Sequence, residues 1–411
     1  MKIKFSINEI LQYLLSLCMI LNFETVWNWT NYGNKFRILV FFISVFTLFL
    51  LILLDYKKNN RKVLKKKCMT LFLLFLYLFI FNLLNLNNIK GTIQISILII
   101  LFYIYFYDYI QIKKFMSKFI NVVFTISVIS LFFFVFSNLL NIISTNDKIL
   151  IYVNNVPKYC DNFFNLHYLI QKESTLGFQL YRNTSIFYEA PKFSLIVSIA
   201  FMYSLLFEEK KSYIKIIVFI LTIITSFSLI GIFSIVIFYV LYIILNDSKK
   251  TKKSFLKKMF IFLLLILISI PAYKFAWNIL EIKSSTSSYL TRLDNYQAGI
   301  KAWKENPLFG SGYEDMSIIK KYYSEFRKND IGYTISILRV MAQGGIYLLL
   351  LYFIPIFKCI IFSLNNKKYY ALVFSLFFIF LFVTNSFCYN YLTLFLLIFF
   401  DRISKKENIN D

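Results

Sequence analysis

Long, unbroken runs of apolar residues dominate the chain, and short stretches that hold most of its lysines separate them. Many runs reach roughly 20 residues, the length that an α-helix needs to cross the hydrocarbon core of a bilayer. The apolar residues within them are continuous rather than alternating, which predicts helices and not the strands of a membrane barrel. We therefore predict an all-α fold, a polytopic membrane helix bundle with about 12 transmembrane helices.

The apolar run at 214–245 is too long for one span, and the polar stretch at 225–228 before Gly231 predicts a break within it. With that break, the predicted spans are 6–26, 36–54, 69–86, 92–110, 119–143, 193–207, 212–226, 229–246, 259–277, 334–357, 369–385 and 388–401. They divide the chain into transmembrane helices 1–5 (1–143), a first long loop (144–192), transmembrane helices 6–9 (193–277), a second long loop (278–333), and transmembrane helices 10–12 with a tail (334–411). We expect short amphipathic helices in both long loops.

Lysines and arginines gather in alternate connections, which keeps those connections in the cytoplasm. The basic connections are 55–68, 111–118, 208–215, 247–258 and 358–368. This pattern predicts cytoplasmic N- and C-termini and places both long loops outside a cytoplasmic (inner) membrane. The net charge of +24 is then a consequence of topology and of contact with anionic membrane lipid, so we expect no nucleic acid partner. The richness in Lys, Asn, Ile and Phe is typical of an AT-rich bacterial genome.

The metal-binding residue types are sparse. The cysteines show no paired or metal-like spacing, and His167 is the single histidine, which we interpret as a loop residue. No glycine-rich nucleotide motif is present. We therefore expect no metal and no other cofactor. A metal-dependent transferase that uses Glu24, in the first exterior loop, stays open as an alternative.

The second long loop contains a pattern typical of an amphipathic helix. Four apolar residues recur at helical spacing, namely Leu290, Leu293, Ile300 and Trp303. The helix should end at Asn306-Pro307, before the glycine-rich turn 310–312. One side of it would carry Arg292, Tyr296, Gly299 and Trp303. A surface helix with a solvated arginine is the alternative interpretation.

Two further arginines lie where spans begin. Arg339 falls about five residues inside a predicted span, where a charge costs about 2–3 kcal/mol and usually faces a cavity or a partner. Snorkelling to the interface is the alternative for it, and close helix packing is the expected role of Gly344 and Gly345. The first long loop ends in Tyr181-Arg182-Asn183-Thr184-Ser185-Ile186-Phe187-Tyr188-Glu189-Ala190-Pro191-Lys192-Phe193, which brings an arginine, a carboxylate and aromatic rings to the next span.

These residues together resemble the Wzy-type oligosaccharide repeat-unit polymerases and the related O-antigen ligases. The resemblance rests on Arg182 followed by Glu-x-Pro before a span, then on a downstream arginine, a Trp-containing helix and Asn-Pro-Leu-Phe-Gly-Ser-Gly at 306–312. The stretches LTIITSFSLIGIF (221–233) and GGIYLLLL (344–351) are also similar to spans of that family.

The resemblance implies a metal-independent, inverting glycosyltransferase that acts on sugars carried by undecaprenyl pyrophosphate, with Arg182, Arg292 and Arg339 as essential arginines. Guanidinium groups suit this chemistry because they remain protonated and bind the departing pyrophosphate in a bidentate manner. Glu189 and Asp294 are the carboxylates nearest in sequence. Two roles stay open for them: a catalytic base, or an ion-pair partner that holds an arginine. The expected substrate contacts are Tyr181, Tyr188, Lys192, Trp303 and Tyr313.

The expected partners are the lipid-linked oligosaccharide, a chain-length regulator and a flippase. The ligase branch typically has a histidine-asparagine pair where this chain has Gly332-Tyr333-Thr334, which favours a polymerase. A ligase remains an alternative, as does a lipid-linked oligosaccharide flippase or other transporter. A transporter would show inverted repeats and ionisable groups near the membrane midplane. A noncatalytic scaffold is the last alternative.

Overall fold

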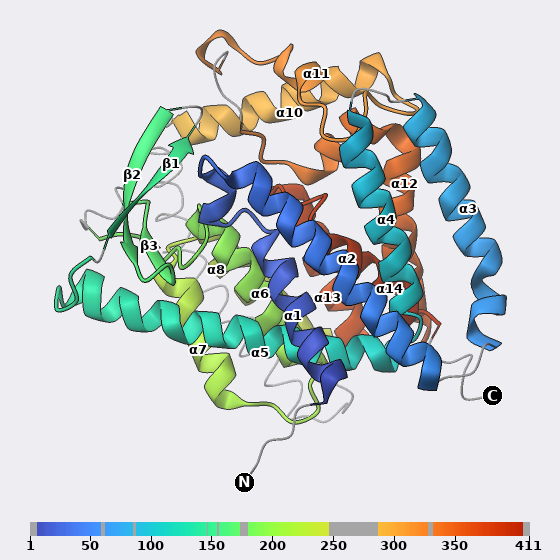
Figure 1. The fold of residues 1–411 in the computed structure, drawn as a ribbon, viewed down its shortest axis with the longest axis horizontal. Coiled ribbons are helices and arrows are strands. Elements are labelled where there is room, and N and C mark those ends of the chain that lie inside the picture. The colour runs from blue at the N-terminus through green and yellow to red at the C-terminus, as the bar shows by residue number, and fades with distance from the viewer. Residues whose placement is uncertain are drawn as a thin grey trace.

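The computed structural model describes residues 6–58, 62–84, 88–145, 147–153, 156–172, 180–245, 287–327 and 332–405. Helices form the body of the molecule, α10 and α11 lie across one end of it, and a small sheet lies beside that end (Figure 1). Within the described residues, four helices are long and apolar enough to cross a membrane, namely Gly33–Tyr56, Tyr109–Leu139, Ala190–Phe207 and Ser336–Asn365. The chain is therefore a membrane protein.

Helices occupy eleven of the predicted spans. They are α1 (Ile7–Leu21), α2 (Gly33–Lys58), α3 (Lys62–Leu84), α4 (Ile89–Tyr105), α5 (Tyr109–Phe133), α6 (Ala190–Phe207), α7 (Tyr213–Thr225), α8 (Leu229–Leu245), α12 (Ser336–Asn365), α13 (Tyr369–Thr384) and α14 (Tyr391–Ile403). The predicted span 259–277 lies outside the described residues. The number of membrane crossings stays a prediction.

The predicted break at 225–228 is confirmed, because α7 ends at Thr225 and α8 begins at Leu229. Phe227 adopts a left-handed backbone, with a φ of 49°. The Ser226 hydroxyl donates to the carbonyl of Ile223 at 2.6 Å and accepts the Ser228 amide at 3.3 Å. Serine is well suited to such a turn because its short side chain can replace backbone partners that a broken helix loses.

Helix α6 lies at the centre of the bundle, and nearly all of its residues are buried. Pro191 occupies its first turn, where a missing amide hydrogen costs nothing. Helix α8 crosses it so closely that a Cβ at Gly231 would collide with the Ser194 hydroxyl. The first turns of α6 are therefore packed tightly against α8.

A three-stranded antiparallel sheet was not predicted. Its strands are β1 (Asp147–Val153), β2 (Val156–Phe163) and β3 (His167–Leu169), in the order β1-β2-β3. Asp147 of β1 pairs with Asn162 of β2, and Phe163 of β2 pairs with His167 of β3. The expectation of short amphipathic helices in the first loop is wrong for this stretch. The β-branched and aromatic residues of Ile149-Leu150-Ile151-Tyr152-Val153 favour a strand.

The second loop contains a helix where one was predicted, α10 (Ser287–Glu305). Its predicted apolar side is wrong, because Leu290, Leu293 and Ile300 are exposed, whereas Asp294, Asn295, Ala298 and Ala302 are buried. A short helix, α11 (Ser317–Lys320), and a 3₁₀ turn at Glu325–Arg327 follow it. The buried side of α10 packs on the start of α12, and Ala298 and Ala302 allow the close approach. Helix α10 thereby joins the second loop to the helix that carries Arg339.

Helix α12 is interrupted at Gly345, whose φ of 63° and ψ of −166° are not helical. The glycine-rich turn after α10 fills the gap. Ser311 and Gly312 donate their amides to the carbonyls of Ala342 and Gln343 at 3.0 and 2.9 Å. On the other side, Ile346 donates its amide to the Pro307 carbonyl at 2.9 Å. Backbone groups that the break leaves without helical partners are thus paired by this turn, which we call the 307–312 clasp.

Candidate active site

Arg182 is fixed against the break between α7 and α8. Its Nε donates to the carbonyl of Ser226, and its Nη2 donates to that of Phe227, both at 3.0 Å. A helix C-terminus carries partial negative charge, so a guanidinium is favourable there. Its own backbone amide donates to the Gln171 carbonyl at 2.8 Å, which ties this arginine to the segment after the sheet.

Asn183 helps to hold Arg182 at the break between α7 and α8, and it was not among the predicted site residues. It is fully buried and accepts a hydrogen bond from the Ser130 hydroxyl. Its side-chain amide and its backbone amide donate to the Thr225 hydroxyl and carbonyl, each at 3.0 Å. The sequence offers one signal that could have identified Asn183: it is an asparagine between an arginine and a threonine. Its side-chain amide can bond a backbone group and a hydroxyl group at the same time.

Glu189 immediately precedes α6 and is partly buried. Burial raises the pKa of its carboxyl above the ordinary value of 4.5, and the positive charge of Lys192 opposes that shift. Arg182 and Arg292 also attract this carboxylate, although they come from different loops. Two of the three predicted arginines therefore act electrostatically on one carboxyl group, at the beginning of the central helix.

Lys192 binds two other segments. Its Nζ lies 3.0 Å from Glu24 Oε1 and donates to the Ser386 carbonyl at 2.6 Å. Glu24 lies between α1 and α2 in a left-handed backbone conformation with a φ of 48°, and its carbonyl accepts the Tyr188 amide at 3.1 Å. The ammonium of Lys192, which was a predicted substrate contact, is thus engaged in joining the α1–α2 and α13–α14 connections to α6.

Arg339 lies one turn into α12, where Tyr389 and Glu314 are its neighbours. Its guanidinium lies 5.5 Å from the centre of the Tyr389 ring, and its Nη2 lies 3.9 Å from Glu314 Oε1. The Nε also donates a long hydrogen bond of 3.4 Å to Gln343.

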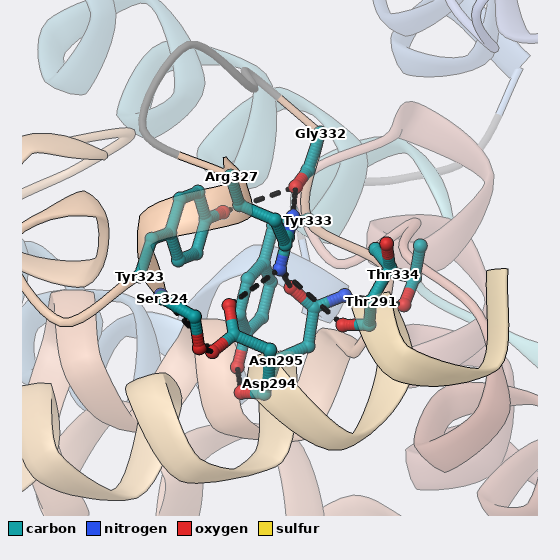
Figure 2. A network of polar contacts seen from close by, with 9 residues as sticks. All are labelled: Thr291, Asp294, Asn295, Tyr323, Ser324, Arg327, Gly332, Tyr333 and Thr334. Carbon is teal, nitrogen blue, oxygen red and sulfur yellow. Dashed lines mark hydrogen bonds and ion pairs between the residues drawn. The ribbon is translucent and has the colours of Figure 1, made fainter. Parts of the chain in front are cut away.

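Asp294 lies on the buried side of α10, whereas Arg292 is exposed two residues earlier. The carboxylate of Asp294 pairs with Arg327 at 3.1 Å and accepts the Ser324 amide at 3.1 Å and the Ser324 hydroxyl (Figure 2). Of the two roles that the sequence left open for this aspartate, its contacts favour the pairing role. Its partner is Arg327, however, and none of the three predicted arginines.

The four predicted aromatic contacts do not form one cluster. Tyr181 is held by Asn138, whose side chain accepts its amide at 3.1 Å and donates to its carbonyl at 2.6 Å. Tyr188 stacks on Trp29 with ring centres 4.5 Å apart. Trp303 donates to the Pro307 carbonyl at 3.1 Å. Tyr313 adjoins the Arg339 site, because its ring contacts Tyr389 with centres 4.7 Å apart.

An apolar cavity of about 170 Å³ is lined in part by Tyr389, the residue whose ring lies near Arg339. Tyr313 and Tyr389 line one end, and the lining extends along α14 as far as Asp401. Four helices, α3, α4, α12 and α14, form its walls with side chains such as Leu78, Ile95, Leu348 and Leu394. The ring that contacts the Arg339 guanidinium is therefore also the end wall of an apolar space between helices.

Residues 214–353 match the family model described as O-antigen ligase. This match supports a relationship to the O-antigen ligase/polymerase superfamily. The matched segment holds Arg292, the 307–312 clasp and Arg339, whereas Arg182, Glu189 and Lys192 precede it. No curated protein matches the chain. The O-antigen ligase family acts on lipid-linked oligosaccharides in the membrane.

Proposed function

We propose that the chain is a polysaccharide polymerase. It joins oligosaccharide repeat units that are linked to undecaprenyl pyrophosphate, at the outer face of a bacterial cytoplasmic membrane. The transfer is inverting and needs no metal ion. Both termini lie in the cytoplasm, so that the end of the bundle covered by α10 faces outward.

One observation carries the proposal: guanidinium groups from two separate loops act on one partly buried carboxyl group at the start of the central helix. Arg182 belongs to the first loop and Arg292 to the second, and both attract Glu189. A space bordered by such groups suits a doubly charged leaving group flanked by an acceptor hydroxyl. Arg339 supplies the third guanidinium, beside Tyr389 and Glu314.

In the proposed reaction, a hydroxyl oxygen of the acceptor repeat unit attacks the anomeric carbon of the donor sugar. The bond between that carbon and the pyrophosphate oxygen breaks on the opposite side, and the lipid pyrophosphate leaves with the electron pair. Arg182, Arg292 and Arg339 stabilise the developing charge. Glu189 takes the hydroxyl proton, since its raised pKa makes it a better base than an ordinary carboxylate.

The apolar cavity supports a lipid-linked donor. It lies among helices, and its end wall Tyr389 contacts Arg339. A polyprenyl chain in this cavity would bring its pyrophosphate next to that guanidinium. An apolar chain is favoured there because about 25 cal/mol is gained for each Å² of apolar surface that leaves water.

The test uses purified protein in liposomes, incubated with an undecaprenyl-pyrophosphate repeat unit in the presence of EDTA. A ladder of sugar polymers is expected. Arg182→Lys, Arg292→Lys and Arg339→Lys should each lower the rate of chain growth about 100-fold or more, because lysine cannot reproduce the guanidinium fork. Lys301→Met, at an exposed position of α10, is the matched control and should keep the wild-type rate.

A ligase is the second candidate, favoured by the description of the family model itself. It would give one transfer to a different acceptor, for example a lipid A core oligosaccharide, and no ladder. Polymer growth that proceeds unchanged in all three arginine variants would contradict the arginine mechanism for either enzyme.

A further inference from the structure

Arg327 is a buried arginine that the proposed reaction does not use. Its residue is only 2% exposed. Its Nη1 lies 3.1 Å from Asp294 Oδ2 and donates to Asn295 Oδ1 at 2.7 Å. Its Nη2 donates to the Gly332 carbonyl at 2.6 Å, and the guanidinium lies 4.0 Å from the centre of the Tyr323 ring (Figure 2). Acceptors from two separate segments therefore converge on one guanidinium.

These contacts join α10 to the residues that lead into α12. Asn295 accepts from Arg327 and donates from its Nδ2 to the Thr334 hydroxyl at 2.8 Å. The Tyr333 hydroxyl donates to the Asn295 carbonyl at 2.9 Å. Figure 2 shows these side chains pointing toward one another between α10 and the segment before α12. Removal of Arg327 would therefore take a hydrogen-bond partner from buried polar groups of both segments.

The same interface sets the distance between two of the predicted arginines. At Gly299 of α10, an added Cβ would collide with the Tyr333 hydroxyl and come within 2.9 Å of the Leu338 side chain. Leu338 directly precedes Arg339 on α12, and Arg292 lies two turns before Gly299 on α10. A shift of α10 on α12 would therefore move Arg292 relative to Arg339.

We propose that Arg327 is a positioning residue, which holds α10 on the start of α12 so that Arg292 faces the pyrophosphate together with Arg339. This inference rests on the proposed function. It assigns Arg327 an effect that reaches the substrate only through Arg292, because Arg327 itself is enclosed by Asp294, Asn295 and Tyr323. Arg182 is bound to the α7–α8 break, so its placement should not depend on Arg327.

The test is a pair of double-mutant cycles on the affinity for undecaprenyl pyrophosphate, measured in nanodiscs so that inactive variants can be compared. Arg327→Gln and Arg292→Lys should each weaken binding about tenfold, the loss expected for a charge-assisted hydrogen bond. The variant with both changes should also be weaker by only about tenfold, because the second change acts on an arginine already lost. Combined with Arg182→Lys, Arg327→Gln should instead give the product of both effects, about 100-fold.

A purely structural role predicts that the effects multiply in both cycles, and that result would overturn the inference. Thr334→Val gives a second route if Arg327→Gln does not accumulate in the membrane, because it removes only the bond to Asn295. It should show the same pattern with a smaller effect of about threefold. If Arg292→Lys and Arg182→Lys leave the affinity unchanged, the proposed function fails instead. The two failures are therefore distinguishable.

Discussion

The interruption of α12 can be tested by Gly345→Ala. The backbone at Gly345, with a φ of 63° and a ψ of −166°, lies in a region that only glycine populates readily. A side chain there costs about 1–3 kcal/mol in backbone strain. The added Cβ would also collide with the carbonyl group of Leu308, which is backbone and cannot rotate away. Overpacking of this kind costs about 1–3 kcal/mol more.

The expected total is a loss of about 2–6 kcal/mol, which is large against a total stability of about 5–15 kcal/mol for a typical protein. The helix can escape the strain by becoming continuous at residue 345, but it would then expel the 307–312 clasp. Gly312 would leave the Gln343 carbonyl, and Glu314 would move away from Arg339. Chain growth should therefore fall with stability.

Thermal unfolding in detergent and the polymer ladder in liposomes measure both effects. Gly332→Ala is the matched control, because a Cβ at Gly332 meets no atom within 4 Å. It keeps the carbonyl that accepts from Arg327 and should be neutral in both assays. If Gly345→Ala behaves like this control, the non-helical backbone at 345 is not needed and the reasoning is refuted.

Three further changes test other parts of the structure. Lys192→Met should lower the free energy of chemical unfolding by about 1–3 kcal/mol, because Lys192 forms an ion pair with Glu24. The loss should be smaller in a Glu24→Gln background, where the ion pair is already absent. Equal losses in both backgrounds would contradict this coupling. Tyr389→Leu should weaken undecaprenyl pyrophosphate binding about threefold by removing the ring beside Arg339, whereas Tyr389→Phe, which keeps the ring, should bind as wild type. Burial lowers the pKa of His167 from 6.5 to about 3. Below pH 6.5 the unfolded chain therefore binds a proton at this histidine and the folded chain does not. The free energy of unfolding should then fall by about 1.4 kcal/mol for each pH unit. His167→Phe should remove this part of the pH dependence of the thermal midpoint between pH 7.5 and 5, and an unchanged slope would show that the imidazole titrates normally.

Much of the helical framework was predictable, because long apolar runs admit few other structures. Local signals also located the break at 225–228 and the ends of α10, since serine, proline and glycine act within a few residues. The sheet at 147–169 was not predicted, because the loop lies between two strong membrane-span patterns and its own strand pattern is weak. Its strand signal is short and gains stability only from pairing with residues farther along the chain.

The candidate site was predictable in its residue types but not in its partners. The motif identified Arg182, Glu189 and Arg292, and a shared catalytic role for them stays a prediction. Arg327 could not be found from the sequence, because its partner Asp294 lies 33 residues earlier and nothing local marks the pair. Gly345 was likewise predicted to serve close helix packing. The break in the helix was not predicted, because the main-chain groups that pair with it come from another segment, 307–312.

Four main-chain hydrogen bonds hold the 307–312 clasp to α12. The carbonyls of Pro307 and Leu308 accept two of them, and the amides of Ser311 and Gly312 donate the other two. Hydrogen bonds of this type do not depend on side-chain identity. Leu308 is 52% exposed, so its side chain can be replaced while the main-chain bonds of the clasp remain. Exposed side chains of this segment can therefore vary during evolution without disrupting the helix that its backbone completes.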